Sequence, residues 1–202
     1  MANTLLNVLK FLLAVVLIPA VYTTVITFQA HLVSYPVLYV HAFTAGIITC
    51  LAVFLFLYQF WGLYELEHKM TSGIFRFLAP LDRWLAFLLP TFFILTMGLL
   101  FVICRVIKVE GLEGQLTFLA GLFLSMHILV LSQDLQNPDK GLTKPGYLVI
   151  LALTVILSLF AAILMMDMVT QYSTFDRFSK QWLSNTEHMY QTVTDRIPGL
   201  KK

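Results

Sequence analysis

The feature that most constrains this chain is a long stretch without charge. Between Lys10 and Glu65 the sequence contains no Asp, Glu, Lys or Arg. Over all 202 residues, 12% are charged and 59% are hydrophobic, whereas soluble domains have about 25% charged residues. So few charges cannot cover the surface of a soluble globule of this length, but lipid requires none. The sequence therefore predicts an all-α integral membrane protein that contacts the lipid bilayer.

Five apolar segments have about the length of a transmembrane helix, which needs roughly 20 residues. They cover residues 5–28, 37–63, 84–104, 115–131 and 147–168. The fourth is the shortest and lies near the lower limit for crossing a bilayer. Residues 65–83 mix apolar and charged side chains in a pattern typical of a segment lying on the membrane surface. We expect residues 1–168 to form a bundle of about five transmembrane helices with this interfacial segment.

Residues 169–202 differ sharply in composition from the rest of the chain. Their apolar side chains recur mostly at steps of three and four residues, with charged residues between them, which predicts an amphipathic C-terminal helix. Phe175, Phe178 and Trp182 form a compact aromatic set. Such a set suits contact with a partner protein or with the membrane surface.

The distribution of Lys and Arg predicts the orientation of a multi-pass protein. If the five segments cross in alternation, the residues on the same side as the N-terminus are Lys10, Lys69, Arg76, Arg83, Lys140 and Lys144. Arg105, Lys108, Arg177 and Lys180 lie on the other side. By the positive-inside rule this bias favours a cytoplasmic N-terminus by a small margin.

The middles of the apolar segments contain no Asp, Glu, Lys or Arg. Proton pumps, ion-coupled transporters and intramembrane hydrolases usually need such groups at that depth. The sequence also lacks nucleotide-binding and hydrolase motifs. A net charge of +2 without a run of Lys and Arg argues against nucleic-acid binding. We therefore expect a protein that is not an enzyme.

Three histidines near or within the spans are candidate ligands for haem b: His31, His41 and His127. One haem needs two ligands at nearly the same depth. His41 lies near the start of its span, whereas His127 lies about 18 Å along the fourth at 1.5 Å per residue, so these two do not match. His31 and His41 could match in depth only if the first span extends past its apolar end. Interfacial or hydrogen-bonded histidines explain the pattern better, and we expect neither a cofactor nor a metal. A haem-bearing redox anchor stays an alternative.

Small residues predict where helices approach closely. Ala42, Gly46 and Cys50 follow one another at four-residue steps, and so do Thr117, Gly121 and Ser125. Both stripes predict tight helix packing, either within one chain or in an oligomer. Arg105 and Asp167 end two spans on the same side, which predicts an ion pair between the third and fifth spans.

These observations favour a non-catalytic membrane subunit. It would oligomerise, or anchor and regulate a partner membrane or peripheral protein, through the small-residue stripes and the tail. A second hypothesis is an oligomeric pore lined by hydroxyl groups such as those of Thr23, Thr24 and Thr27.

Overall fold

The computed structural model describes residues 2–57, 69–70, 73, 76, 90–107, 111–136 and 145–196. Within these residues the long elements are all helices and no strand occurs. The helices are α1 (Ala2–Leu32), α2 (Val37–Leu57), α5 (Thr91–Ile107), α6 (Glu113–Gln136), α7 (Pro145–Thr170) and α8 (Phe175–Arg196). The predicted interfacial segment 65–83 falls almost entirely outside the described residues, as do 58–63, 84–89 and 197–202.

Three of the helices are long and apolar enough to cross a membrane. The qualifying segments are Thr4–Leu32 of α1, Val37–Phe56 of α2 and Gly146–Thr170 of α7. Large apolar side chains lie exposed on their surfaces, and Phe56 is 86% exposed. Lipid is the solvent that such surfaces fit. The prediction of an all-helical membrane protein is confirmed at this level, and the count of five spans stays a prediction.

Helix α6 is longer than the apolar segment predicted from the sequence. The prediction covered residues 115–131, whereas α6 runs from Glu113 to Gln136. Its C-terminal part contains Ser132, Gln133 and Asp134. These polar residues end the apolar run, but their backbone groups continue the helical hydrogen bonds. Hydropathy therefore located the apolar part of this helix and not its C-terminal end.

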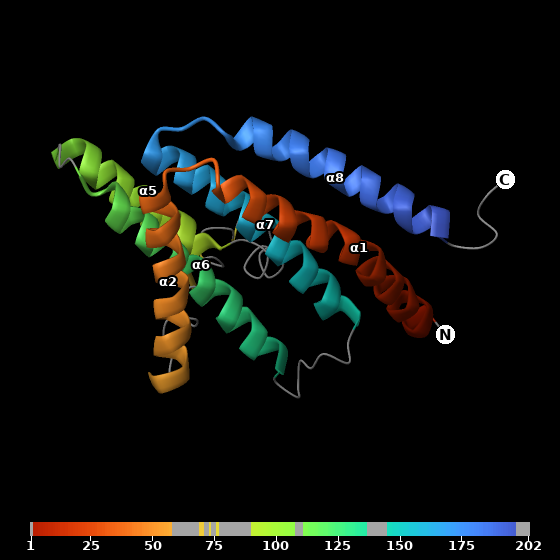
Figure 1. Cartoon of the computed structure of the whole chain (residues 1–202). Helices are drawn as coiled ribbons and strands as arrows, with labels where there is room; N and C mark the ends of the chain where they lie inside the picture. Colours follow the sequence, from red (N-terminus) through yellow and green to blue (C-terminus); the bar gives the residue numbers. More distant parts are fainter. Residues whose placement is uncertain are drawn as a thin grey trace.

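Helices α1 and α7 run parallel, and α8 returns along them (Figure 1). The Lys10 side chain lies over Gly146 at the start of α7. At the opposite end, Tyr35, just after α1, contacts Asp167 near the end of α7. Helix α8 then runs antiparallel to α1, from His31 back to the level of Val16. The chain thus builds a three-helix unit from its first and last helices.

The reversal between α7 and α8 uses only residues 171–174. Gln171 follows the last residue of α7 and has a φ of 59°, the left-handed conformation that commonly ends helices. At the other connection, the Pro36 carbonyl accepts hydrogen bonds from the backbone N–H groups of Tyr39 and Val40 as α2 begins. Proline suits this position because the first helical N–H groups have no partner within the helix.

Helices α2 and α6 pack backbone against backbone. A Cβ added to Gly46 would lie 2.1 Å from the Phe118 carbonyl oxygen, and one added to Gly121 would lie 2.1 Å from that of Phe43. Cys50 packs with Met126 farther along the same pair. The structure thus places the two predicted small-residue stripes against each other within one chain, which leaves neither glycine free for an oligomer contact in this arrangement.

One apolar cluster joins the six helices of the described residues. Its buried members come from each of them and include Phe28, Phe43, Phe93, Leu124, Ile163 and Phe178. The cluster holds the α1–α7–α8 unit against the α2–α6 pair and fixes the position of α8.

Candidate functional site: a polar interface between α1 and α8

Asp167 ties the beginning of α8 to the end of α7. Its Oδ2 accepts hydrogen bonds from the backbone N–H groups of Thr174 and Phe175, at 2.7 and 2.8 Å. Its Oδ1 accepts from the hydroxyls of Tyr35 and Thr174, at 2.7 and 2.8 Å. Helix N-termini leave N–H groups without intrahelical partners, so this carboxylate caps α8 from a neighbouring helix.

His31 completes the same cluster from α1. Its Nε2 lies 2.8 Å from the Thr174 Oγ1, and its ring packs edge-on against those of Tyr35 and Phe178. A carboxylate only accepts hydrogen bonds, so the Thr174 hydroxyl proton points to Asp167 and its oxygen is left to accept. This assigns the proton to Nε2 of His31, which then donates to Thr174.

The hydrogen-bond order of Asp167, Thr174 and His31 differs from that of a catalytic triad. In a triad the carboxylate bonds the histidine, and the histidine bonds the nucleophilic hydroxyl. Here Asp167 bonds Thr174 directly, and His31, Thr174 and Asp167 are all buried. Among the described residues no group of three or more His, Cys, Asp and Glu is arranged to hold a metal ion. The arrangement fastens the start of α8 to α1 and α7.

A row of threonines continues the interface along α1. The Trp182 Nε1 donates to the Thr24 hydroxyl at 2.7 Å, and the Asn185 amide donates to the Thr27 hydroxyl at 2.8 Å. A further hydrogen bond of 2.7 Å joins the hydroxyls of two threonines, Thr23 and Thr186. The threonines that the sequence suggested as a pore lining are therefore buried under α8 in this structure.

The aromatic set of α8 packs around one ring of α7. Phe160 makes edge contacts with Phe175, Phe178 and Trp182, at centroid distances of 6.0, 4.9 and 5.1 Å. Phe178 is fully buried. The sequence predicts that these three rings meet a partner or lipid; in the structure Phe178 is turned into the chain, while Phe175 and Trp182 are half-buried. The physical reason is the tight reversal at residues 171–174, which brings this face of α8 onto α7.

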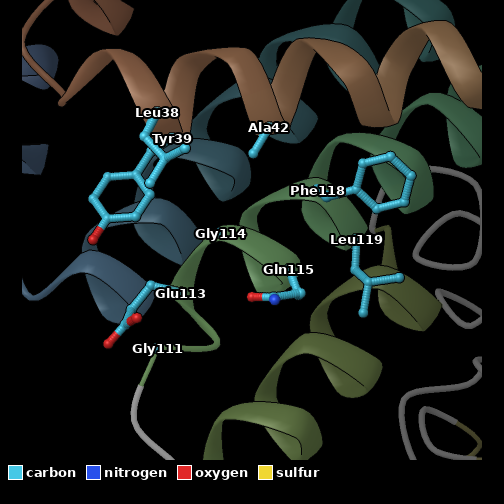
Figure 2. A pocket seen from close by; sticks show the side chains of 9 residues that line it. All are labelled: Leu38, Tyr39, Ala42, Gly111, Glu113, Gly114, Gln115, Phe118 and Leu119. Carbon is cyan, nitrogen blue, oxygen red and sulfur yellow. The ribbon is translucent and has the colours of Figure 1, made fainter.

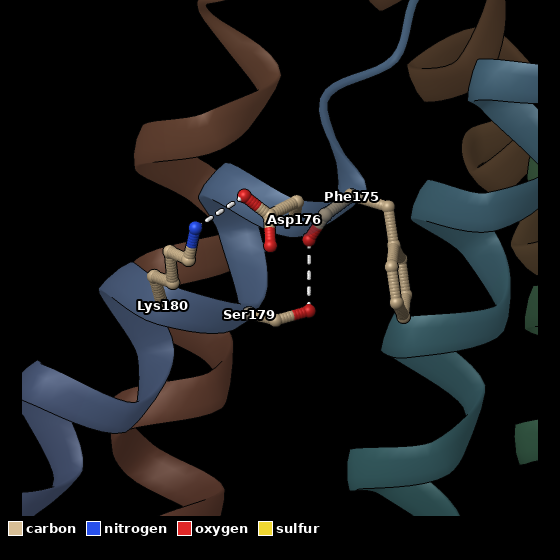
Figure 3. Close-up of polar contacts among 4 residues, drawn as sticks. All are labelled: Phe175, Asp176, Ser179 and Lys180. Atoms are coloured by element: carbon tan, nitrogen blue, oxygen red, sulfur yellow. Dashed lines mark hydrogen bonds and ion pairs between the residues drawn. The ribbon is translucent and has the colours of Figure 1, made fainter.

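The opposite face of α8 is exposed and mostly polar, although it includes Leu183 and Val193. Figure 3 shows the Phe175 ring pointing toward α7, while Asp176 and Lys180 lie on another side of the helix. These two residues form an ion pair of 2.7 Å, with both side chains 77% exposed. The Ser179 hydroxyl donates to the Phe175 carbonyl at 2.8 Å. An exposed pair of this kind contributes little to stability, about 0.3–0.5 kcal/mol.

Tyr35 is the titratable group of this cluster that lies outside the membrane-length segments. Burial raises the pKa of its hydroxyl, and the neighbouring Asp167 carboxylate raises the pKa further. The hydroxyl therefore stays neutral and able to donate to Asp167 over the whole physiological range.

The remaining predicted site residues lie apart from this interface. His41 is exposed on α2 near the level of residues 117–118, and His127 is buried on α6 beside Met126. Those levels differ by roughly 14 Å along α6 at 1.5 Å per residue, so the two histidines are not matched as ligands of one haem. The side chain of Arg105 lies outside the described residues, so its predicted ion pair with Asp167 stays a prediction.

A hollow lies between the first turns of α2 and α6, with a volume of about 660 Å³. Figure 2 shows the Glu113 carboxylate and the Tyr39 hydroxyl on the same side of this pocket, with the Gln115 side chain beside α6. Glu113 lies in the first turn of α6, where a negative charge interacts favourably with the helix dipole. A structural role accounts for this residue.

Sequence reasoning missed Tyr35, Thr174, Asn185 and Thr186. A signal was present, because Thr24, Thr27 and His31 form a polar stripe at helical spacing on an otherwise apolar helix. A similar stripe runs through Trp182, Asn185 and Thr186. Two such stripes on helices of one chain predict a hydrogen-bonded interface, but the sequence does not say that these two helices are neighbours.

Comparison with known proteins gives no further guide to function. No family model matches the chain, and searches of curated proteins and of solved structures find no significant match.

Proposed function

We propose that this protein is a non-catalytic multi-span membrane subunit that presents the polar outer face of α8 to a partner protein or to a second copy of itself. The observation behind the proposal is that α8 lies along α1, a helix of membrane-crossing length, with its charged side chains exposed. If α1 crosses the bilayer, this face lies at membrane depth. A charge facing lipid costs at least about 2.5–3.5 kcal/mol, so a polar surface has to cover it.

The charges of α8 suggest that a protein, and not lipid, covers its exposed face. The helix contains three acidic residues and three basic ones: Asp176, Glu187, Asp195, Arg177, Lys180 and Arg196. Helices that bind anionic membrane surfaces are rich in Lys and Arg on the polar face and insert an apolar one. The aromatic face of α8 is already occupied by Phe160 and α1. A balanced pattern of both signs instead suits a complementary protein surface.

Extraction in mild detergent, followed by measurement of native mass, tests this proposal. We expect the 23.0 kDa chain to migrate in an assembly that contains further copies or a second protein. Reversing two outward charges, Arg177→Glu with Lys180→Glu, should dissociate that assembly. Arg76→Glu reverses a charge that is also exposed but lies outside α8, and should leave it intact.

A wild-type chain that is monomeric after extraction from native membranes would overturn the proposal. So would an assembly that resists the α8 double reversal. A visible absorption spectrum of the same sample checks the haem alternative, for which a Soret band would be required.

A further inference from the structure

Helices α1 and α7 leave an open groove along the middle of α1 and the first half of α7. Its volume is about 640 Å³, within the range of 300–1,000 Å³ typical of small-molecule sites. Apart from the Tyr22 hydroxyl its walls are apolar, and they include Phe11, Val15 and Ile18 of α1 and Leu148 and Ala152 of α7. The groove lies within the membrane-crossing segments of both helices, and Ile18 at its rim is 62% exposed. An acyl chain fits such walls.

A positive charge stands at one end of this groove. Lys10 directly precedes Phe11, and its Nζ lies 3.8 Å from where a Cβ of Gly146 would be. In the described part of the chain no carboxylate pairs with Lys10, and the first turn of α7 contains no acidic residue. The free N–H groups at the start of α7 add a partial positive charge at the same place. An apolar groove with a cationic end is complementary to an amphiphile with an anionic head.

We propose that this groove binds an acyl chain of an anionic phospholipid, with the phosphate group at Lys10. The bilayer is the source of the ligand because the groove is open along its side, between two helices of membrane-crossing length. The long, flexible stem of lysine lets its ammonium reach the headgroup level from within a span. The distribution of Lys and Arg favours a cytoplasmic N-terminus, and anionic lipids are enriched in the cytoplasmic leaflet.

Native mass spectrometry tests the site. The full chain is reconstituted into vesicles of equal parts phosphatidylglycerol and phosphatidylcholine, extracted in mild detergent, and the retained lipids are identified. We expect preferential retention of phosphatidylglycerol by about fivefold, the effect of one cation near an anionic headgroup. Lys10→Gln should remove this preference, and Lys10→Arg should keep it.

A second pair of variants tests the groove itself. Ala152→Phe fills the groove and should abolish retention of both lipids. Leu164→Phe adds bulk to the same helix at a position that is 43% exposed and does not line the groove, so its retention should match the wild type. Equal retention of the two lipids by the wild type, or unchanged retention by Ala152→Phe, would overturn the proposal. Oleate added to the vesicles and retained in place of phosphatidylglycerol would also overturn it.

Discussion

Replacing Asp167 by Asn should release α8 from the rest of the chain. The asparagine has nearly the same shape but only one oxygen, so its amide nitrogen occupies the place of one carboxylate oxygen. If that nitrogen replaces Oδ2, it faces the N–H groups of Thr174 and Phe175, which now bond that atom. If it replaces Oδ1, the oxygen keeps the two backbone N–H groups, and the Tyr35 and Thr174 hydroxyls have to turn to accept from the amide. In either orientation none of the four hydrogen bonds is made to a charged group any longer.

The expected size of the effect follows from the loss of charge on the shared acceptor. Hydrogen bonds to charged groups contribute about 1.5–3 kcal/mol each, against about 0.5–1.5 kcal/mol for neutral ones. With four such bonds weakened, the docking free energy of α8 should fall by about 3–6 kcal/mol. At 1.4 kcal/mol per tenfold, the population of chains with α8 undocked should rise by at least about 100-fold.

Limited trypsin digestion measures that population, because cleavage after Arg177 and Lys180 requires α8 to open locally. We expect the Asp167→Asn variant to be cut at these two sites at least about 100-fold faster than the wild type, with mass spectrometry identifying the fragments. Asp176→Asn is the matched control. It removes the same charge from a side chain that bonds only Lys180 on the surface, and it should change the rate less than about threefold. Equal rates for the two variants would refute the role assigned to Asp167.

Three further predictions concern packing, backbone conformation and pH. Gly46→Ala should destabilise the detergent-solubilised protein by about 1–3 kcal/mol or more, because the new Cβ would lie 2.1 Å from the Phe118 carbonyl oxygen. Gly98→Ala is the control, since a Cβ there would have nothing within 4 Å, and it should be neutral or stabilising. A similar loss of thermal stability in both variants would contradict the packing argument. Gln171→Gly should stabilise the fold by about 0.5–1 kcal/mol and so raise the melting temperature slightly, since glycine adopts a φ of 59° without strain. A lower melting temperature would show that the side chain matters more than the backbone. Because the pKa of Tyr35 is raised in the fold, its contribution should persist up to about pH 10, the ordinary tyrosine pKa, and decline above it; trypsin resistance of α8 should show this decline, and Tyr35→Phe should lack that component.

The helices of this protein could be predicted largely from their apolar content. Residues 5–28 and 147–168 fall within α1 and α7, because a long apolar run in lipid has to satisfy its backbone hydrogen bonds within a helix. The close packing of Gly46 and Gly121 was also readable, since only small residues at four-residue steps let two backbones touch. The sequence did not predict that these two stripes pack against each other, or that they do so within one chain.

The candidate site was far less predictable. Asp167 attracted notice as a charge at the end of a span, but its partners Tyr35 and Thr174 lie 132 and 7 residues away along the chain. Phe178 and Trp182 follow the spacing of an amphipathic helix, and that spacing describes equally well a helix docked on its own chain and one that waits for a partner.

The sequence by itself therefore predicted a lipid environment and the all-helical class. It also predicted which faces of the helices carry small, apolar or polar side chains. These properties follow from the side chains and from hydrogen bonding within single segments. Only the tertiary structure decided that α8 turns back at residues 171–174, covers Thr23, Thr24 and Thr27, and leaves its charged face outward. That decision depends on contacts between the two ends of the chain, and local sequence patterns contain no information on which distant stripes become neighbours.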